Sequence, residues 1–325
     1  MNARRKSLKV IAVVIVLLLS ACGEKGPIIP PTATPTPTIM PTHTPTQTPT
    51  LTIKLTPTPG IGSTWARPAD GMVMVYVPEG EFSMGMDADA AWETCKQLVD
   101  KPGPERYLDV EPVHTVVLDA FWIDRTEVTN AMYALCVSTG GCRPSHETSS
   151  YTRSDYYGNP EFADYPVIYV SWNDAETYCT WAGARLPTEA EWERTARGTD
   201  GRIYPWGNSS PSCSLLNSSP ISTACVGDTS RVGSTPPGAS PYGALDMAGN
   251  VYEWVADWYG QDYYSQSPAG NPTGPSSGDW RVLRGSPWSF NVVGVCSALR
   301  SREYPAKPNP VSGFRCARGT LPPAP

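Results

Sequence analysis

The chain has 325 residues and a net charge of −6 at pH 7, from 25 lysines and arginines against 31 aspartates and glutamates. This mild acidity, without a basic stripe, argues against nucleic acid as a partner. Hydrophobic residues make up 40% of the chain and include 11 tryptophans, so the composition allows a substantial folded core.

The first residues have the pattern of a secretory signal. A short basic stretch precedes an apolar run over residues 10–19. A membrane-spanning helix needs roughly 20 apolar residues, so this shorter run predicts a signal peptide over residues 1–21. Its end resembles a lipobox, which predicts that Cys22 is lipidated and anchors the protein to the membrane outside the cytoplasm, facing the cell surface or envelope. The alternative is ordinary signal cleavage, with Cys22 incidental.

A Pro/Thr-rich segment follows, and with the lipidated cysteine it covers residues 22–64. Such a segment has little apolar surface to bury, so we expect an extended stalk rather than a folded unit. The stalk is a plain spacer, although segments of this composition can also carry O-linked sugars. Residues 65–321 then form a single domain, and residues 322–325 a short tail.

The domain is predicted to begin with short strands. Two of them cover residues 72–77 and 80–84, on either side of a Pro-Glu turn. A third covers residues 113–118 and leads into the aromatic stretch at residues 121–124.

Three helices follow in the sequence. Thr129 is typical of an N-cap, and it predicts a helix that ends near two consecutive glycines. A second helix is predicted to begin near Ser171 and to end at Trp181. The third has the clearest start, because Thr188 and Glu191 have the spacing of a capping box.

Regular structure becomes sparse after the third helix. From residue 205 onward glycine, proline, serine and asparagine dominate, which indicates tight turns. Short strands are still predicted at residues 282–283 and 314–316. The sequence therefore predicts an α+β fold with low regular secondary structure and much ordered loop.

The cysteines indicate an oxidising compartment. The sequence has 9 cysteines, and all except Cys22 lie in the domain. An even number in an exported domain predicts disulfides, and the lack of a Cys-x-x-Cys motif argues against a zinc knuckle or a thioredoxin-like site. Two pairs lie close in the sequence, Cys136 with Cys142 and Cys213 with Cys225. Sequence spacing leaves the connectivity of the others open.

Several motifs together resemble the formylglycine-generating enzyme (sulfatase-modifying factor) family, and they occur in family order. They lie at residues 121–130, 166–167, 170–175, 178–183, 185–193, 204–207, 242–254, 284–286 and 313–316. The resemblance implies the fold of that family, which is related to C-type lectins and is stabilised by disulfides and calcium. It also implies a disulfide between Cys179 and Cys316. A second family bridge starts from a position that is Ala196 here, which leaves Cys95 as the candidate partner of Cys296.

The resemblance further implies calcium. The matching family positions are Asp246, Gly249, Val251 and Glu253. Two carboxylates with backbone carbonyls between them suit a cation that prefers oxygen ligands. The alternative is a turn in which Asn250 and Glu253 bond backbone amides. A second and weaker calcium site would lie at Asn217 and Asp228.

The copper positions of the family differ in this chain. The oxidases of the family bind copper(I) through two cysteines, because soft thiolates suit that ion. Alignment on Gly285 and Ser286 places Ser289 and Gly294 at these two positions. Neither residue can supply a thiolate, so we expect no copper and no catalytic residue for the oxidation of cysteine to formylglycine.

Three functions are consistent with these patterns. The first is a non-oxidase binding or structural module, displayed at the membrane, for an unknown protein or carbohydrate ligand. The second is a genuine formylglycine-generating oxidase, an oxidoreductase that acts on exported sulfatases. The third is a lectin-like carbohydrate binder that stacks sugars on aromatic side chains. The candidate aromatics are Trp258, Tyr259, Tyr263, Tyr264 and Trp288.

Overall fold

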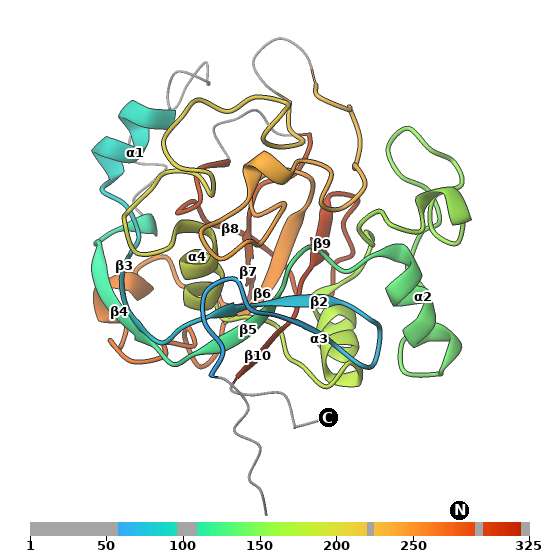
Figure 1. The fold of residues 1–325 in the computed structure, drawn as a ribbon, viewed down its shortest axis with the longest axis horizontal. Helices are drawn as coiled ribbons and strands as arrows, with labels where there is room; N and C mark the ends of the chain where they lie inside the picture. Colours follow the sequence, from blue (N-terminus) through green and yellow to red (C-terminus); the bar gives the residue numbers. More distant parts are fainter. Residues whose placement is uncertain (1–57, 96–108, 220–223, 290–294, 320–325) are drawn as a thin grey trace, which may run out of the picture. The chain divides into compact units, whose positions relative to one another are not determined.

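The computed structural model describes residues 58–95, 109–219, 224–289 and 295–319 (Figure 1). They belong to one compact unit, Thr56–Pro325. The predicted signal peptide, Cys22 and the stalk up to residue 57 lie outside the described residues, as does Gly294. Within the described part of the chain, no helix has the length and hydrophobicity needed to cross a membrane.

The first sheet brings the beginning and the end of the domain together. Its order is β1-β2-β5-β10, and all its pairs are antiparallel. The strands are β1 (Thr64–Ala66), β2 (Val73–Val77), β5 (Phe121–Asp124) and β10 (Ala317–Gly319). Every residue of the central strand β5 is buried, so this sheet is packed on both faces.

The remaining strands form a two-stranded ribbon and a second sheet. The ribbon pairs β3 (Gly80–Met84) with β4 (His114–Leu118). The second sheet has the order β8-β7-β6-β9, with a parallel pairing only between β6 and β9. Its strands are β6 (Tyr252–Trp258), β7 (Arg281–Arg284), β8 (Ser301–Glu303) and β9 (Ser312–Phe314).

The three predicted helices are present, and each begins at a capped residue. Helix α2 (Asn130–Ser138) starts after Thr129, whose hydroxyl accepts the N–H of Met132. Helices α3 (Trp172–Trp181) and α4 (Glu189–Arg197) both start with capping boxes, which satisfy backbone N–H groups that have no partner within the helix. The other helical segments are α1 (Ala88–Cys95), η3 (Pro160–Phe162), η4 (Pro236–Gly238) and η5 (Tyr263–Gln266).

Helix α4 lies in the centre of the core. All of its residues are buried, the charged ones included. It contacts both β6 and β7, whereas α3 contacts β6 (Figure 1). Trp192 on α4 and Trp254 on β6 are among the largest fully buried side chains. Helices α3 and α4 therefore both pack on the second sheet and bury its residues.

Disulfides join the three predicted pairs among the described cysteines. They are Cys136 with Cys142, Cys179 with Cys316 and Cys213 with Cys225. Cys296 is also disulfide-bonded. The side chain of Cys95, its predicted partner, lies outside the described residues.

Candidate functional site

The predicted calcium loop is a tight turn that leads into β6. Asp246, Gly249 and Asn250 all have positive φ angles, of 57°, 83° and 60°. A Cβ atom on Gly249 would lie 2.3 Å from the carbonyl oxygen of Asn217, so only glycine fits there. The loop is thus built by left-handed residues and by close contact with a second loop.

Asn250 ties this turn to its surroundings. Its Oδ1 accepts the N–H of Ser230 at 2.8 Å, and its Nδ2 donates to Glu127 at 3.0 Å. Asn250 is almost fully buried. The sequence predicted only that Asn250 could bond backbone amides within a turn. In the structure its side chain also contacts the carboxylate of Glu127.

Glu253 lies at the start of β6 and forms a buried ion pair. Both of its carboxylate oxygens accept from Arg315, each at 2.6 Å, and Trp192 donates to one of them at 2.8 Å. Neither Glu253 nor Arg315 is exposed to solvent. A bidentate pair of this kind satisfies both groups without a metal.

The loop nevertheless brings three buried carboxyl groups together. Glu127, Asp246 and Glu253 lie close to the guanidinium of Arg315. Burial and then the neighbouring Asp246 and Glu253 carboxylates raise the pKa of Glu127 well above its usual range. Burial also raises the pKa of Asp246, whose carboxylate accepts the N–H of Gly233 at 2.6 Å.

This arrangement decides which donors suit a calcium ion. The carboxyl groups of Glu127 and Asp246 are buried side by side and hydrogen-bond to each other when one of them is protonated. A divalent cation could take the place of that proton, and the Asp246 carboxylate is a suitable hard ligand. Glu253, by contrast, is already paired with Arg315. The donor set therefore fits a cation near Asp246 better than near Glu253.

The second predicted calcium pair is used differently. The Asp228 carboxylate accepts from Ser150 at 2.6 Å and from the Thr152 hydroxyl at 2.7 Å, and it lies 3.2 Å from Arg153. Asn217 contacts the backbone carbonyl of Asp228, not its carboxylate. Asp228 thus fastens the loop at residues 150–153, and these contacts do not point to a shared cation.

Ser289, one of the two predicted copper positions, lies in a turn directly after β7, and the other, Gly294, lies outside the described residues. Ser286 has a positive φ of 63° and is buried, and Ser289 is exposed. Neither the hydroxyl of Ser286 nor the indole N–H of Trp288 has a hydrogen-bond partner among the described residues. Tyr151, 76% exposed, packs its ring 5.2 Å from that of Trp288. Both of these polar atoms are buried, so the exposed groups at this turn are Ser289 and the ring of Tyr151.

The described part of the chain has no free thiol near this turn. Every cysteine whose side chain the structure describes is disulfide-bonded. A cysteine in a disulfide has no thiolate to donate to a metal. The described part of the chain thus offers no pair of free sulfurs at the position of Ser289.

The sequence predicted five aromatic residues as a possible sugar-stacking platform, and they differ in how far the structure buries them. Tyr259, Tyr264 and Trp288 are buried, with 9%, 2% and 6% of their surface exposed. Trp258 is partly buried and stacks on the guanidinium of Arg281 at 3.6 Å. Tyr263 is partly buried against the core. These side chains contribute to packing and do not form one exposed face.

Helix α4 carries a buried ionic cluster that sequence patterns did not reveal. Arg284 on β7 donates to Glu189 at 2.9 Å and to Glu193 at 2.7 Å. Arg300 contacts Glu189 at 2.7 Å. The side chains of all four residues are at most 2% exposed. Because each charge is paired, the cluster links α4 to β7 and leaves no free acid or base.

Comparison with known proteins gives consistent results. Residues 63–320 match the sulfatase-modifying factor enzyme 1-like domain. The formylglycine-generating enzyme of Streptomyces coelicolor is 35% identical over 303 residues, covering 78% of this chain and 91% of that enzyme. The serine/threonine-protein kinase pkn1 of Chlamydia pneumoniae is 37% identical over 259 residues, covering 75% of this chain and 38% of the kinase. The chain thus spans well under half the length of that kinase.

Solved structures share the architecture. PvdO from Pseudomonas aeruginosa superposes with a TM-score of 0.65 and 26% identity, covering 81% of this chain and all of that one. Variable protein 1 of Treponema denticola superposes with a TM-score of 0.60 and 21% identity, over 79% of this chain and 99% of that one, and shares the fold alone.

Proposed function

Because the chain belongs to the sulfatase-modifying factor enzyme 1-like family, we propose that it uses the family fold as a binding module and does not oxidise cysteine. One prediction from the sequence carries this proposal: alignment on Gly285 and Ser286 places Ser289 and Gly294 at the positions of the two copper-binding cysteines. A serine hydroxyl is a poor ligand for copper(I), and glycine has no side chain to offer. The residues at this position therefore do not fit copper.

Binding is assigned to the turn at residues 286–289. Ser289 is exposed at this turn, whereas the Ser286 hydroxyl and the Trp288 N–H are buried and out of reach of a ligand at the surface. The exposed Tyr151 adds a stacking surface at the same place. The ligand is a protein segment or a carbohydrate that covers this aromatic ring.

A peptide oxidation assay tests the absence of oxidase activity. A peptide with the sequence Cys-x-Pro-x-Arg is incubated with the protein, copper(I) and oxygen, and the aldehyde is sought by its mass shift. The Streptomyces coelicolor formylglycine-generating enzyme is the positive control. We expect no aldehyde from this chain above the level without protein. Turnover to the aldehyde would refute the proposal.

An oxidase remains the second candidate, because the match to the Streptomyces enzyme covers nearly the full length of that enzyme. The same assay decides between the two functions. Peptide and glycan arrays then test binding at the turn, with Tyr151→Ala as the variant. Tyr151 is exposed, so its replacement should leave the fold intact and abolish array signals that depend on this surface.

We also propose that the protein is exported, lipidated on Cys22 and stabilised by calcium. The N-terminal pattern supports the first two points, and metabolic labelling with palmitate in wild type and in Cys22→Ala tests them. The three neighbouring buried carboxyl groups support calcium, which Asp246 would hold with the carbonyls of Gly249 and Val251. Calcium would raise the melting temperature of the wild type, and a chelator would reverse the effect. In Asp246→Asn neither addition should change it.

A further inference from the structure

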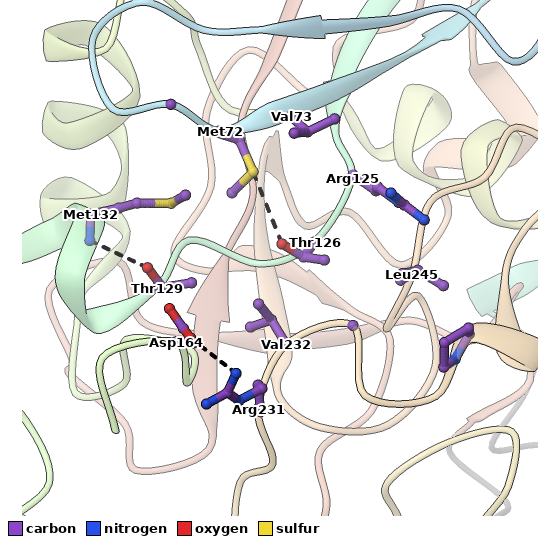
Figure 2. A pocket seen from close by; sticks show the side chains of 13 residues that line it. Met72, Val73, Arg125, Thr126, Thr129, Met132, Asp164, Arg231, Val232 and Leu245 are labelled. Carbon is purple, nitrogen blue, oxygen red and sulfur yellow. Dashed lines mark hydrogen bonds and ion pairs between the residues drawn. The ribbon is translucent and has the colours of Figure 1, made fainter. Parts of the chain in front are cut away.

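A cavity separate from the turn at residues 286–289 opens beside the start of α2. Its volume is about 410 Å³, which is within the range of small-molecule sites. Figure 2 shows Met72, Val73 and Arg125 on one side of it, and Asp164, Val232 and Arg231 on the other. The cavity therefore lies where the start of β2, the segment after β5 and the loop at residues 231–236 meet.

One part of the lining is apolar. It is formed by Met72, Val73, Met132, Val232 and Leu245. Met72 is buried, whereas Val73 is 38% exposed at the cavity wall. Methionine side chains adapt to irregular shapes, so this wall suits an apolar group of variable form.

The polar part of the lining is dominated by arginine. The guanidinium of Arg125 is exposed, and no hydrogen bond or ion pair engages it among the described residues. Arg231 lies 3.2 Å from Asp164, and the two side chains are 61% and 59% exposed. An ion pair this exposed contributes little, so a ligand can displace Asp164 at small cost. Two guanidiniums and one carboxylate leave the cavity with a net positive charge.

Backbone groups add little to this charge. The N–H groups of Asn130 and Ala131, at the start of α2, donate to the carbonyls of Tyr165 and Ala163. The N–H of Met132 donates to the hydroxyl of Thr129. Recognition of an anion therefore depends on Arg125 and Arg231.

We propose that this cavity binds a molecule in which a carboxylate is joined to an apolar group. The carboxylate pairs with the Arg231 guanidinium in the place of Asp164, and the Arg125 guanidinium on the other side of the cavity adds positive charge. The apolar group packs against the two methionines. A free aliphatic carboxylic acid and the C-terminal residue of a peptide both have this chemistry.

Calorimetric titration with four probes tests the charge and separates the two sources. Octanoate is compared with octanol, and acetyl-glycyl-leucine with its C-terminal amide. We expect each acid to bind about tenfold more tightly than its uncharged partner, since charge-assisted hydrogen bonds are the stronger ones. If octanoate binds more tightly than the peptide, the ligand is a free acid; the reverse order indicates a peptide end. Failure of both acids to bind, or equal binding of acid and uncharged partner, overturns the proposal.

Variants at exposed positions locate the binding. Arg231→Gln should weaken binding of the preferred acid about tenfold, whereas Asp164→Asn should strengthen it roughly threefold by freeing Arg231. Arg143→Gln, at an exposed arginine outside the cavity, is the matched control and should change nothing. Val73→Trp should block the apolar part. Unfolding curves verify that each variant is folded, and an Arg231→Gln protein that binds like the wild type overturns the assignment.

Discussion

At the scale of single residues, Arg315 neutralises the buried carboxylate of Glu253 in the core of the protein. It holds both oxygens of Glu253 and also donates to the backbone carbonyls of Asp124 and Leu245. It is fully buried, and so is its partner. A buried pair adds little net stability, but the removal of one partner leaves an uncompensated charge.

Arg315→Met should therefore lower the free energy of unfolding by about 3–5 kcal/mol. Urea denaturation followed by tryptophan fluorescence measures this loss. Arg143→Met, at an exposed arginine, should change it by less than about 0.5 kcal/mol. Equal stability of the two variants would contradict the role given to Arg315.

Asp257 makes stability depend on pH. Its Oδ2 accepts the N–H of Glu189 at 2.8 Å, and the residue is buried. Burial and then the neighbouring Glu189 carboxylate raise the pKa of Asp257 to about 8. In the unfolded chain its pKa is about 4. Between these values the folded protein therefore holds a proton that the unfolded chain has lost.

This contribution is complete below about pH 4 and is lost as the pH rises through 8. The slope attributable to this group is at most about 1.4 kcal/mol per pH unit. Asp257→Asn keeps a carbonyl oxygen for the Glu189 N–H and removes the titration. Between pH 5 and pH 8 the wild type should therefore lose more stability than the variant in parallel urea titrations. Identical pH profiles would disprove this assignment.

At the scale of elements, the caps fix where the helices begin. Thr188 and Glu191 bond reciprocally to each other's backbone N–H groups, at 3.2 and 2.8 Å. Thr188→Ala should lower the free energy of unfolding by about 1 kcal/mol. Thr180→Ala, at an exposed threonine of α3, is the control, with an expected change below about 0.5 kcal/mol. A loss at Thr188 no larger than that at Thr180 would mean that packing alone fixes the start of α4.

Local signals account for the elements that could be predicted. The predicted α+β fold is confirmed by the family match and by the similarity to PvdO. The caps at Thr129 and Thr188 were predicted because a cap and its partner lie within one turn of each other, and the start of α3 was predicted near its cap, Ser171. The strand at residues 80–84 was also predicted in full.

Strand β6 could not be predicted, for a different reason. It carries Glu253 and Asp257, two carboxylates that do not fit the pattern of a buried strand. Both are buried because their partners come from distant parts of the chain, Arg315 for the first and the start of α4 for the second. Glu127 and Arg315 are also far from the calcium loop in the sequence, so the loop motif did not predict their contacts with it.

At the scale of the whole molecule, one disulfide closes most of the domain. Cys179 and Cys316 are 137 residues apart, whereas Cys136 and Cys142 are separated by 6. In the chain-entropy model the longer loop contributes about 5 kcal/mol and the shorter about 2 kcal/mol. Replacing each pair by alanines should reproduce this order in thermal unfolding. A larger loss from the short loop would contradict the entropic account.

We propose that this family member has no copper site at the turn after β7. A copper(I) titration against a chromophoric chelator measures this most directly, with the wild type beside a Ser289→Cys/Gly294→Cys double variant. We predict that the wild type leaves the chelator fully loaded and that the double variant removes about one equivalent of copper, since paired thiolates bind copper(I) strongly. Stoichiometric copper on the wild type would contradict the claim.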